Sequence, residues 1–203
     1  MKIAIYGGTF NPPHLGHLKL ARQMQEKFSL DRVLFMPSGN SYMKNGVLEK
    51  RHRYNMTKLM VSNLENISVS DYEVNKEGPS YTFETLTYFK ESHPSDQLYF
   101  IMGADSLMYI ENWKHPEIIF EKAVILCAFR KEYKNTNLDF KTLEMKAREL
   151  ENRFCGKIEL MAFHEAVSSS DIRNKLMQNI DCTADLSEAV LSYIQENHLY
   201  QTL

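Results

Sequence analysis

Short apolar runs alternate along this chain with segments in which apolar residues recur every three to four positions. The runs predict strands at residues 2–6, 32–37, 67–74, 97–104, 123–129 and 157–163. The recurring positions predict helices at residues 18–28, 51–64, 81–92, 138–154, 168–178 and 186–199, with a further helical stretch around Trp113. Alternation of helices with continuously apolar strands is typical of a parallel sheet covered on both faces. We therefore predict an α/β fold built on a doubly wound parallel sheet.

A single domain over residues 1–203 is expected, because the length suits one sizeable core and neither a repeat nor a linker interrupts the chain. The composition, 43% hydrophobic and 25% charged, is that of an ordinary globular protein. The net charge of −2 gives no reason to expect nucleic acid or an anionic membrane as a partner.

No segment of the sequence indicates export, a membrane span or a disulfide framework. The longest uninterrupted apolar run, residues 123–129, is far too short to cross a bilayer, and residues 2–8 lack the pattern of a signal peptide. Cys127, Cys155 and Cys182 are widely spaced and form no CxxC pair. We expect a reduced, cytoplasmic protein.

The most demanding stretch, GGTFNPPHLGH at residues 7–17, connects the first predicted strand to the first helix. Its glycines permit positive φ and close approach of a ligand, and its two prolines stiffen the connection. The helix should begin near His14 or Leu15, where free amides and the helix dipole favour a phosphate. His14 and His17 are three residues apart, so they share one face of the first helical turn.

Other interpretations of this stretch remain open from the residues alone. It is compatible with a proline-rich turn that carries two exposed histidines. A zinc site is disfavoured because no third ligand is marked, and the glycine spacing matches neither the dinucleotide fingerprint nor the P-loop.

The same stretch closely resembles the signature of the nucleotidyltransferases that carry an HxGH motif, here His14-Leu15-Gly16-His17, on a Rossmann-like core. Three further segments narrow the resemblance: GPSYTFETL at residues 78–86, FIMGADSLMYIENW at 100–113 and VSSSDIR at 167–173. Their order and spacing resemble the bacterial nicotinate-nucleotide adenylyltransferase family over almost the whole chain. The resemblance implies a Rossmann-like sheet and transfer of AMP from ATP to nicotinate mononucleotide, with release of deamido-NAD and pyrophosphate.

The resemblance also implies which residues bind ATP. The phosphates would lie against the first loop, His14 and His17, and the helices from about residue 168 would contact the adenylate. The implied ATP residues are Gly7, Gly8, Thr9, Phe10, His14, His17, Gly103, Asp105, Ser168, Ser169, Ile172 and Arg173. Catalytic roles fall to His14, His17, Lys44 and Arg173.

The acceptor nucleotide would contact a second set, in which Trp113 stacks on the pyridine ring. The implied acceptor residues are Thr9, Lys44, Tyr81, Thr82, Tyr109 and Trp113. Lys44 follows Tyr42-Met43, where the family loop commonly reads proline-histidine before the lysine. Preference for the acid over the amide nucleotide rests on the resemblance.

The residues suit the implied chemistry. A phosphate nucleophile with a second pKa of about 6 is largely ionised at neutral pH, so no general base is needed. Catalysis then rests on aligning two anions and neutralising charge at the α-phosphate. Mg²⁺ is expected on the ATP phosphates, without a dedicated protein metal site. The partners are ATP and nicotinate mononucleotide, and a homo-oligomer is compatible with the sequence.

Each of these residues also has a purely structural interpretation. Trp113 could be a core residue, Asp105 could cap a helix, and the segment at 168–173 reads as an N-cap with Asp171 in the first turn. The basic group Lys50, Arg51 and Arg53 reads as a solvated helix start, and Arg51 or Arg53 could also share the charge of the nearby Lys44.

Three other functions are compatible with the sequence. A related nucleotidyltransferase could use phosphopantetheine or nicotinamide mononucleotide as acceptor, and a nucleotide sensor could keep the fold without the activity. DNA binding is weakly supported, since the chain is slightly acidic and lacks a basic stripe.

Overall fold

Parallel strands form one sheet at the centre of the fold. The computed structural model describes residues 1–39, 46–130, 139–164 and 167–201. Within these residues the sheet has the order β3-β2-β1-β4-β5-β6, and neighbouring strands are parallel throughout. The strands are β1 (Lys2–Gly8), β2 (Arg32–Pro37), β3 (Ile67–Val69), β4 (Gln97–Gly103), β5 (Ala123–Arg130) and β6 (Ile158–Phe163). The predicted doubly wound parallel sheet is confirmed.

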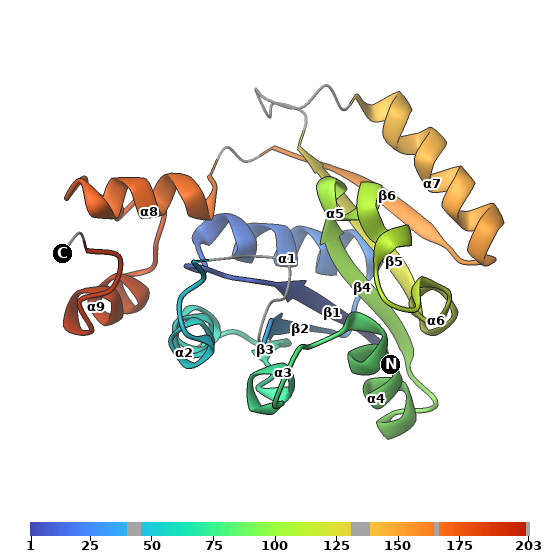
Figure 1. The fold of residues 1–203 in the computed structure, drawn as a ribbon, viewed down its shortest axis with the longest axis horizontal. Coiled ribbons are helices and arrows are strands. Elements are labelled where there is room, and N and C mark those ends of the chain that lie inside the picture. The colour runs from blue at the N-terminus through green and yellow to red at the C-terminus, as the bar shows by residue number, and fades with distance from the viewer. Residues whose placement is uncertain (40–45, 131–138, 165–166, 202–203) are drawn as a thin grey trace.

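Helices cover both faces of this sheet (Figure 1). In chain order they are α1 (Leu15–Phe28), α2 (Lys50–Val61), α3 (Tyr72–Asn75), α4 (Thr82–Ser92), α5 (Ala104–Tyr109), the 3-10 turn η1 (Ile110–Asn112), α6 (Pro116–Lys122), α7 (Phe140–Phe154), α8 (Ser169–Met177) and α9 (Glu188–Glu196). Figure 1 shows α8 and α9 at one end of the molecule, on the side of α2, and α6 and α7 at the opposite end.

The central strands are largely apolar because they bury side chains on both faces. In β4, Leu98, Phe100 and Met102 enter one core, whereas Tyr99 and Ile101 enter the other. The first of these cores includes buried residues of α4, α5, α6 and α7, and the second includes residues of α1, α2, α8 and α9. Period-two alternation between two cores explains why residues 98–102 of β4 form a continuous apolar run.

The third predicted strand is too long. Only Ile67–Val69 pairs with β2, and the chain then turns into α3. The Ser70 hydroxyl accepts a hydrogen bond from the Tyr72 N–H at 3.2 Å, which diverts the backbone from the sheet. Because β3 lies at the edge of the sheet, only one neighbouring strand holds it.

The helical stretch around Trp113 is also broken. Trp113 has an extended backbone after η1, and His115 has a φ of 51° directly before Pro116. Proline disfavours a right-handed helical residue before it and suits the first position of a new helix, so α6 begins at Pro116. The break leaves Trp113 in a connection rather than on a helix face.

Candidate active site

Two cavities open at the carboxyl ends of the strands, where the strand order reverses between β1 and β4. This reversal is where open parallel sheets bind ligands. The first cavity, about 530 Å³, is lined by Gly7, Gly8, Thr9, Met36, Ser38, Glu73, Ser80, Tyr81, Thr82, Phe100, Met102, Gly103, Asp105, Ser106, Tyr109, Trp113 and Lys114. The second, about 490 Å³, is lined by Thr9, Phe10, Asn11, His17, Gly46, Val47, Ser169, Ser170 and Arg173. Thr9 belongs to both cavities, so they meet at the first loop.

The two histidines of the first loop form a stacked pair at the start of α1. Their rings lie 3.6 Å apart, and the backbone N–H of His14 donates to Nδ1 of His17 at 3.2 Å. A neutral imidazole with Nδ1 as acceptor carries its proton on Nε2. His17 therefore has an N–H donor on Nε2 and lines the second cavity, whereas His14 is 1% exposed and lines neither.

The glycines at the end of β1 make room for aromatic rings. A Cβ on Gly8 would lie 2.6 Å from the Phe10 ring, and one on Gly7 would lie 2.8 Å from the ring of Phe100. Neither glycine uses the positive φ that glycine permits, and the left-handed residue of the loop is Phe10, with a φ of 49°. Phe10 is 2% exposed and packs edge-on against His17, with ring centroids 5.0 Å apart.

The start of α8 meets the first loop although the two are far apart in the sequence. The Ser169 hydroxyl donates to the Pro12 carbonyl at 2.9 Å, and Nη1 of Arg173 donates to the Asn11 carbonyl at 2.7 Å. Ser168 caps the helix by accepting from the Asp171 N–H at 3.1 Å, which confirms the predicted N-cap. The N-termini of α1 and α8, together with Arg173, make the second cavity electropositive.

A buried arginine ties the first loop to the segment after β2. Arg53 is 2% exposed and donates to the carbonyls of Thr9 at 2.8 Å, Ser38 at 2.6 Å, Gly39 at 2.9 Å and Leu48 at 2.8 Å. Burial lowers the pKa of Arg53 from its usual value. The prediction of a solvated helix start is thus wrong for Arg53, which positions the loop that both cavities share.

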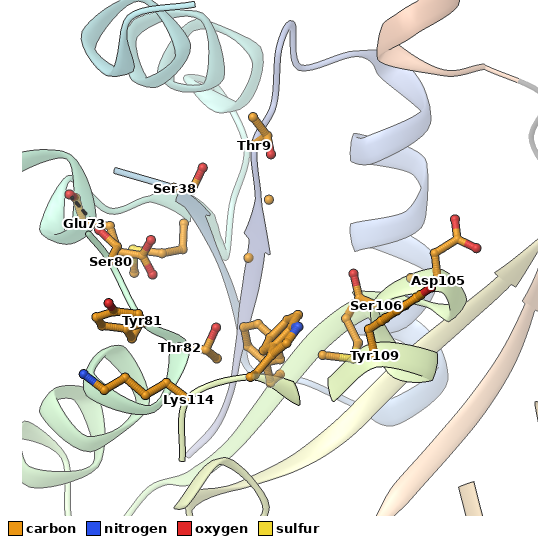
Figure 2. A pocket seen from close by; sticks show the side chains of 17 residues that line it. Thr9, Ser38, Glu73, Ser80, Tyr81, Thr82, Asp105, Ser106, Tyr109 and Lys114 are labelled. Atoms are coloured by element: carbon orange, nitrogen blue, oxygen red, sulfur yellow. Dashed lines mark hydrogen bonds between the residues drawn. The ribbon is translucent and has the colours of Figure 1, made fainter. Parts of the chain in front are cut away.

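Aromatic rings and charged groups line the first cavity from two sides. Figure 2 shows Glu73, Ser80, Tyr81 and Thr82 on one side and Asp105, Ser106 and Tyr109 on the other. The half-buried Trp113 packs edge-on against Phe100, with centroids 6.3 Å apart. Nζ of Lys114 lies 4.4 Å from the centre of the Tyr81 ring, a cation–π contact.

A carboxylate also faces this cavity. Glu73 accepts a hydrogen bond from the Thr85 hydroxyl at 2.7 Å. Burial raises the pKa of Glu73, and hydrogen bonds from Thr85 and from the Gly39 backbone oppose that shift. Glu73 thereby links the start of α4 to the segment after β2.

Comparison with known proteins places the chain in a family. The model of the cytidylyltransferase-like family matches residues 5–175. A protein of Clostridium tetani named "Probable nicotinate-nucleotide adenylyltransferase" is 36% identical, over 98% of this chain and 99% of its own length. The chain belongs to the nicotinate-nucleotide adenylyltransferase family. The resemblance identified in the sequence is therefore confirmed.

A second sequence relative and a solved structure support this family assignment and the fold. A protein of the same name from Lachnoclostridium phytofermentans is 37% identical and covers 98% of both chains. The fold matches that of the Plasmodium falciparum nicotinic acid mononucleotide adenylyltransferase complexed with NaAD, with a TM-score of 0.78 at 23% identity over 98% of this chain and 97% of that chain. Across the part of the chain that the structure describes, no helix is long and apolar enough to cross a membrane.

The residues that the family resemblance implied divide between the two cavities. Those on the first cavity are Gly7, Gly8, Thr9, Tyr81, Thr82, Gly103, Asp105, Tyr109 and Trp113. Those on the second are Thr9, Phe10, His17, Ser169 and Arg173. His14, Ser168 and Ile172 line neither, with exposed fractions of 1%, 8% and 0%. Lys44 lies outside the described residues, and the roles assigned to all these residues stay predictions.

Several residues of the site were not found from the sequence. Arg53 lies on the helix face that also carries Met56 and Met60, so its spacing was a signal of burial. Glu73 lies in what was predicted to be a strand, and Lys114 in a predicted helix, so neither carried a local signal.

Proposed function

We propose that this protein transfers AMP from ATP to nicotinate mononucleotide, giving deamido-NAD and pyrophosphate. The observation that carries the proposal is the pairing of an electropositive cavity, where His17 and Arg173 join two helix N-termini, with an aromatic cavity that contains Trp113. The named relatives cover nearly the whole chain and support the same reaction.

The reaction consists of one displacement at the α-phosphorus of ATP. A phosphate oxygen of nicotinate mononucleotide forms a bond to this phosphorus, and the bond to the β-phosphate oxygen breaks to release pyrophosphate. The attacking phosphate is largely ionised above its second pKa of about 6, so no side chain has to remove a proton. The protein's task is to align two anions and to stabilise the charge that develops between them.

The second cavity suits the phosphates of ATP. The Nε2–H of His17 and the guanidinium of Arg173 donate hydrogen bonds to phosphate oxygens, and the N-terminus of α8, where Ser169 and Ser170 line the cavity, adds backbone amides. Thr9, where the cavities meet, lies near the α-phosphate in this arrangement. Lys44 completes the set as a prediction from the family resemblance.

The first cavity suits the acceptor. Trp113 stacks on the pyridine ring, and Tyr81, Thr82 and Tyr109 surround it. Of the described residues that line this cavity, only Lys114 carries a positive charge, whereas Glu73 and Asp105 carry carboxylates. A nicotinate carboxylate gains from Lys114 an attraction that a nicotinamide group lacks, and we infer a preference for the acid.

We expect that Mg²⁺, if bound, would be held by the ATP phosphates. Among the described residues, no group of three or more His, Cys, Asp or Glu side chains is placed to hold a metal ion. The described lining of the second cavity contains hydroxyl groups of Thr9, Ser169 and Ser170 but no carboxylate. This donor set fits a cation held mostly by phosphate oxygens and water, which would neutralise phosphate charge.

The direct test is pyrophosphate release from ATP and Mg²⁺, with nicotinate and nicotinamide mononucleotide assayed side by side and phosphopantetheine as a third acceptor. Release that depends on nicotinate mononucleotide, with deamido-NAD as the second product, is expected. Release with phosphopantetheine instead would assign a different acceptor. No pyrophosphate release with any of the three acceptors, combined with binding of ATP, would favour a nucleotide sensor.

A further inference from the structure

The segment that follows α8 returns to the first loop. The Leu15 N–H donates to the Asp185 carbonyl at 2.9 Å, and the Tyr200 hydroxyl donates to Oδ1 of Asn11 at 2.7 Å. Tyr200 lies outside the residues that the family model matches, and no motif in the sequence pointed to it. Its contact joins residues 189 positions apart, and its partner Asn11 lines the second cavity.

The fold does not depend on the Tyr200 hydroxyl to hold α9 in place. Leu186, Val190 and Ile194 are buried in the core beneath α1 and α2. The Tyr193 hydroxyl lies 3.0 Å from Nδ1 of His52 and accepts from Asn55 at 3.0 Å, which ties α9 to α2. A local role for the Tyr200 hydroxyl is therefore separable from attachment of the helix.

Asn11 connects this hydroxyl to the candidate ATP site. The Asn11 side chain accepts from Tyr200, while its backbone carbonyl accepts from Nη1 of Arg173 at 2.7 Å. Asn11 lines the second cavity but is only 6% exposed. If its bond to Tyr200 were lost, its side chain would therefore have little access to water for a replacement hydrogen bond. A tyrosine hydroxyl is protonated at neutral pH, and burial raises the pKa of Tyr200 further, opposed by the charges of Arg173 and Arg53, so the hydroxyl can act as a donor there.

We propose that Tyr200 is a positioning residue for the ATP-phosphate site: its hydroxyl fixes Asn11, and through the Asn11 carbonyl it orients the Arg173 guanidinium. The proposal rests on the proposed function, since it assigns Arg173 to the phosphates. Tyr200 itself touches no reacting atom. It acts by reducing the freedom of a cation whose direction decides how well it meets the phosphates.

The test compares Tyr200→Phe with Tyr193→Phe. Each removes one tyrosine hydroxyl from the same part of the chain and leaves the ring in place. Tyr200→Phe should lower kcat/KM for ATP by about 3- to 10-fold, which corresponds to the free energy of one hydrogen bond. The KM for nicotinate mononucleotide should change less than about twofold. Tyr193→Phe should lower the melting temperature and leave both substrates' parameters within about twofold.

Equal effects of the two variants on ATP, or an equal rise in both KM values for Tyr200→Phe, would overturn the proposal, because either result describes a general loss of stability. Calorimetric binding of a non-hydrolysable ATP analogue gives a readout that needs no acceptor. Weaker binding to Tyr200→Phe alone supports the positioning role even if nicotinate mononucleotide proves to be the wrong acceptor.

A double-mutant cycle tests the route through Arg173. In an Arg173→Ala background, Tyr200→Phe should have almost no further effect on binding of the ATP analogue, because the group that it orients is gone. Fully additive losses would show that Tyr200 does not act through Arg173 and would overturn the assignment.

Discussion

The two cavities that meet at Thr9 are built in different ways. The second is lined by Gly46, Val47 and parts of residues 9–17 and 169–173. Hydrogen bonds to backbone carbonyls of the first loop, such as Ser169 to Pro12 and Arg173 to Asn11, hold the last two segments together. Apart from the first loop and the end of β2, the first cavity draws its lining from residues 73–114, where aromatic contacts predominate.

The two cavities therefore bind their ligands through different interactions. Directed N–H groups and helix dipoles suit phosphates, whose position must be exact at the reacting atom. Aromatic faces suit a flat pyridine ring, for which contact area matters more than direction. We therefore predict that a substitution in one cavity weakens the binding or turnover of mainly one substrate.

The largest effect is expected from His17→Ala, which breaks the phosphate side. Loss of the Nε2–H donor should lower kcat by about 10²- to 10³-fold, as removal of a preorganised transition-state donor does. Steady-state pyrophosphate release measures this effect. His93→Ala, which removes an exposed histidine outside both cavities, is the matched control. Near-wild-type turnover by a folded His17→Ala protein would remove His17 from the catalytic role.

Trp113→Ala should break the acceptor side. Loss of one stacking face should raise the KM for nicotinate mononucleotide by about 10- to 100-fold and leave the KM for ATP within about threefold. Trp113→Phe keeps an aromatic face and should recover part of the affinity. Since Trp113 also packs against Phe100, melting temperatures of both variants are needed. A similar rise in both KM values would contradict the stacking assignment.

Lys114→Met sharpens the comparison within the first cavity. The ratio of kcat/KM for the nicotinate nucleotide to that for the nicotinamide nucleotide should fall by about 2- to 5-fold, a small effect because Lys114 is exposed and water screens its charge. Lys114→Arg should keep the ratio, and added salt should erode it in the wild type. Lys122→Met, which removes a lysine that lines neither cavity, should leave the ratio unchanged.

The smallest effect concerns the pH dependence of stability. Because burial raises the pKa of Glu73, its contribution to the free energy of unfolding is complete below the unfolded value of about 4.3 and is lost as the pH rises through the folded value. Glu73→Gln lacks this titration. Its free energy of unfolding, relative to the wild type, should therefore rise across that pH window. Denaturant unfolding at several pH values measures it, with the exposed Glu77→Gln as control. A pH-independent difference would show that Glu73 titrates normally.

Hydrophobic pattern was sufficient for the sheet because its strands are buried on both faces, so continuous apolar runs coincide with β1, β2, β4, β5 and β6. It failed where tertiary contacts or single residues decide the backbone. Ser70 ends β3 through a side-chain hydrogen bond, and Pro116 restarts the helix after Trp113. Neither effect changes the spacing of apolar residues.

The candidate site residues that lie in sequence motifs were predicted from a family resemblance and not from hydrophobic pattern. His17, Trp113 and Arg173 lie in segments that resemble a known family, whereas Arg53 and Tyr200 act through contacts with distant backbone or side chains. Arg53 donates to Thr9 across 44 positions, and Tyr200 donates to Asn11 across 189. The spacing of residues within one segment carries no information about such distant pairs. These contacts can be identified only from the folded structure.

The most direct test of the division between the cavities is a crossed binding experiment. Dissociation constants for nicotinate mononucleotide and for a non-hydrolysable ATP analogue would be measured by calorimetry with Trp113→Ala and with Arg173→Ala. We predict that Trp113→Ala weakens binding of only the pyridine nucleotide and that Arg173→Ala weakens binding of only the ATP analogue, each by at least about 10-fold. Comparable losses for both ligands in both variants would contradict it.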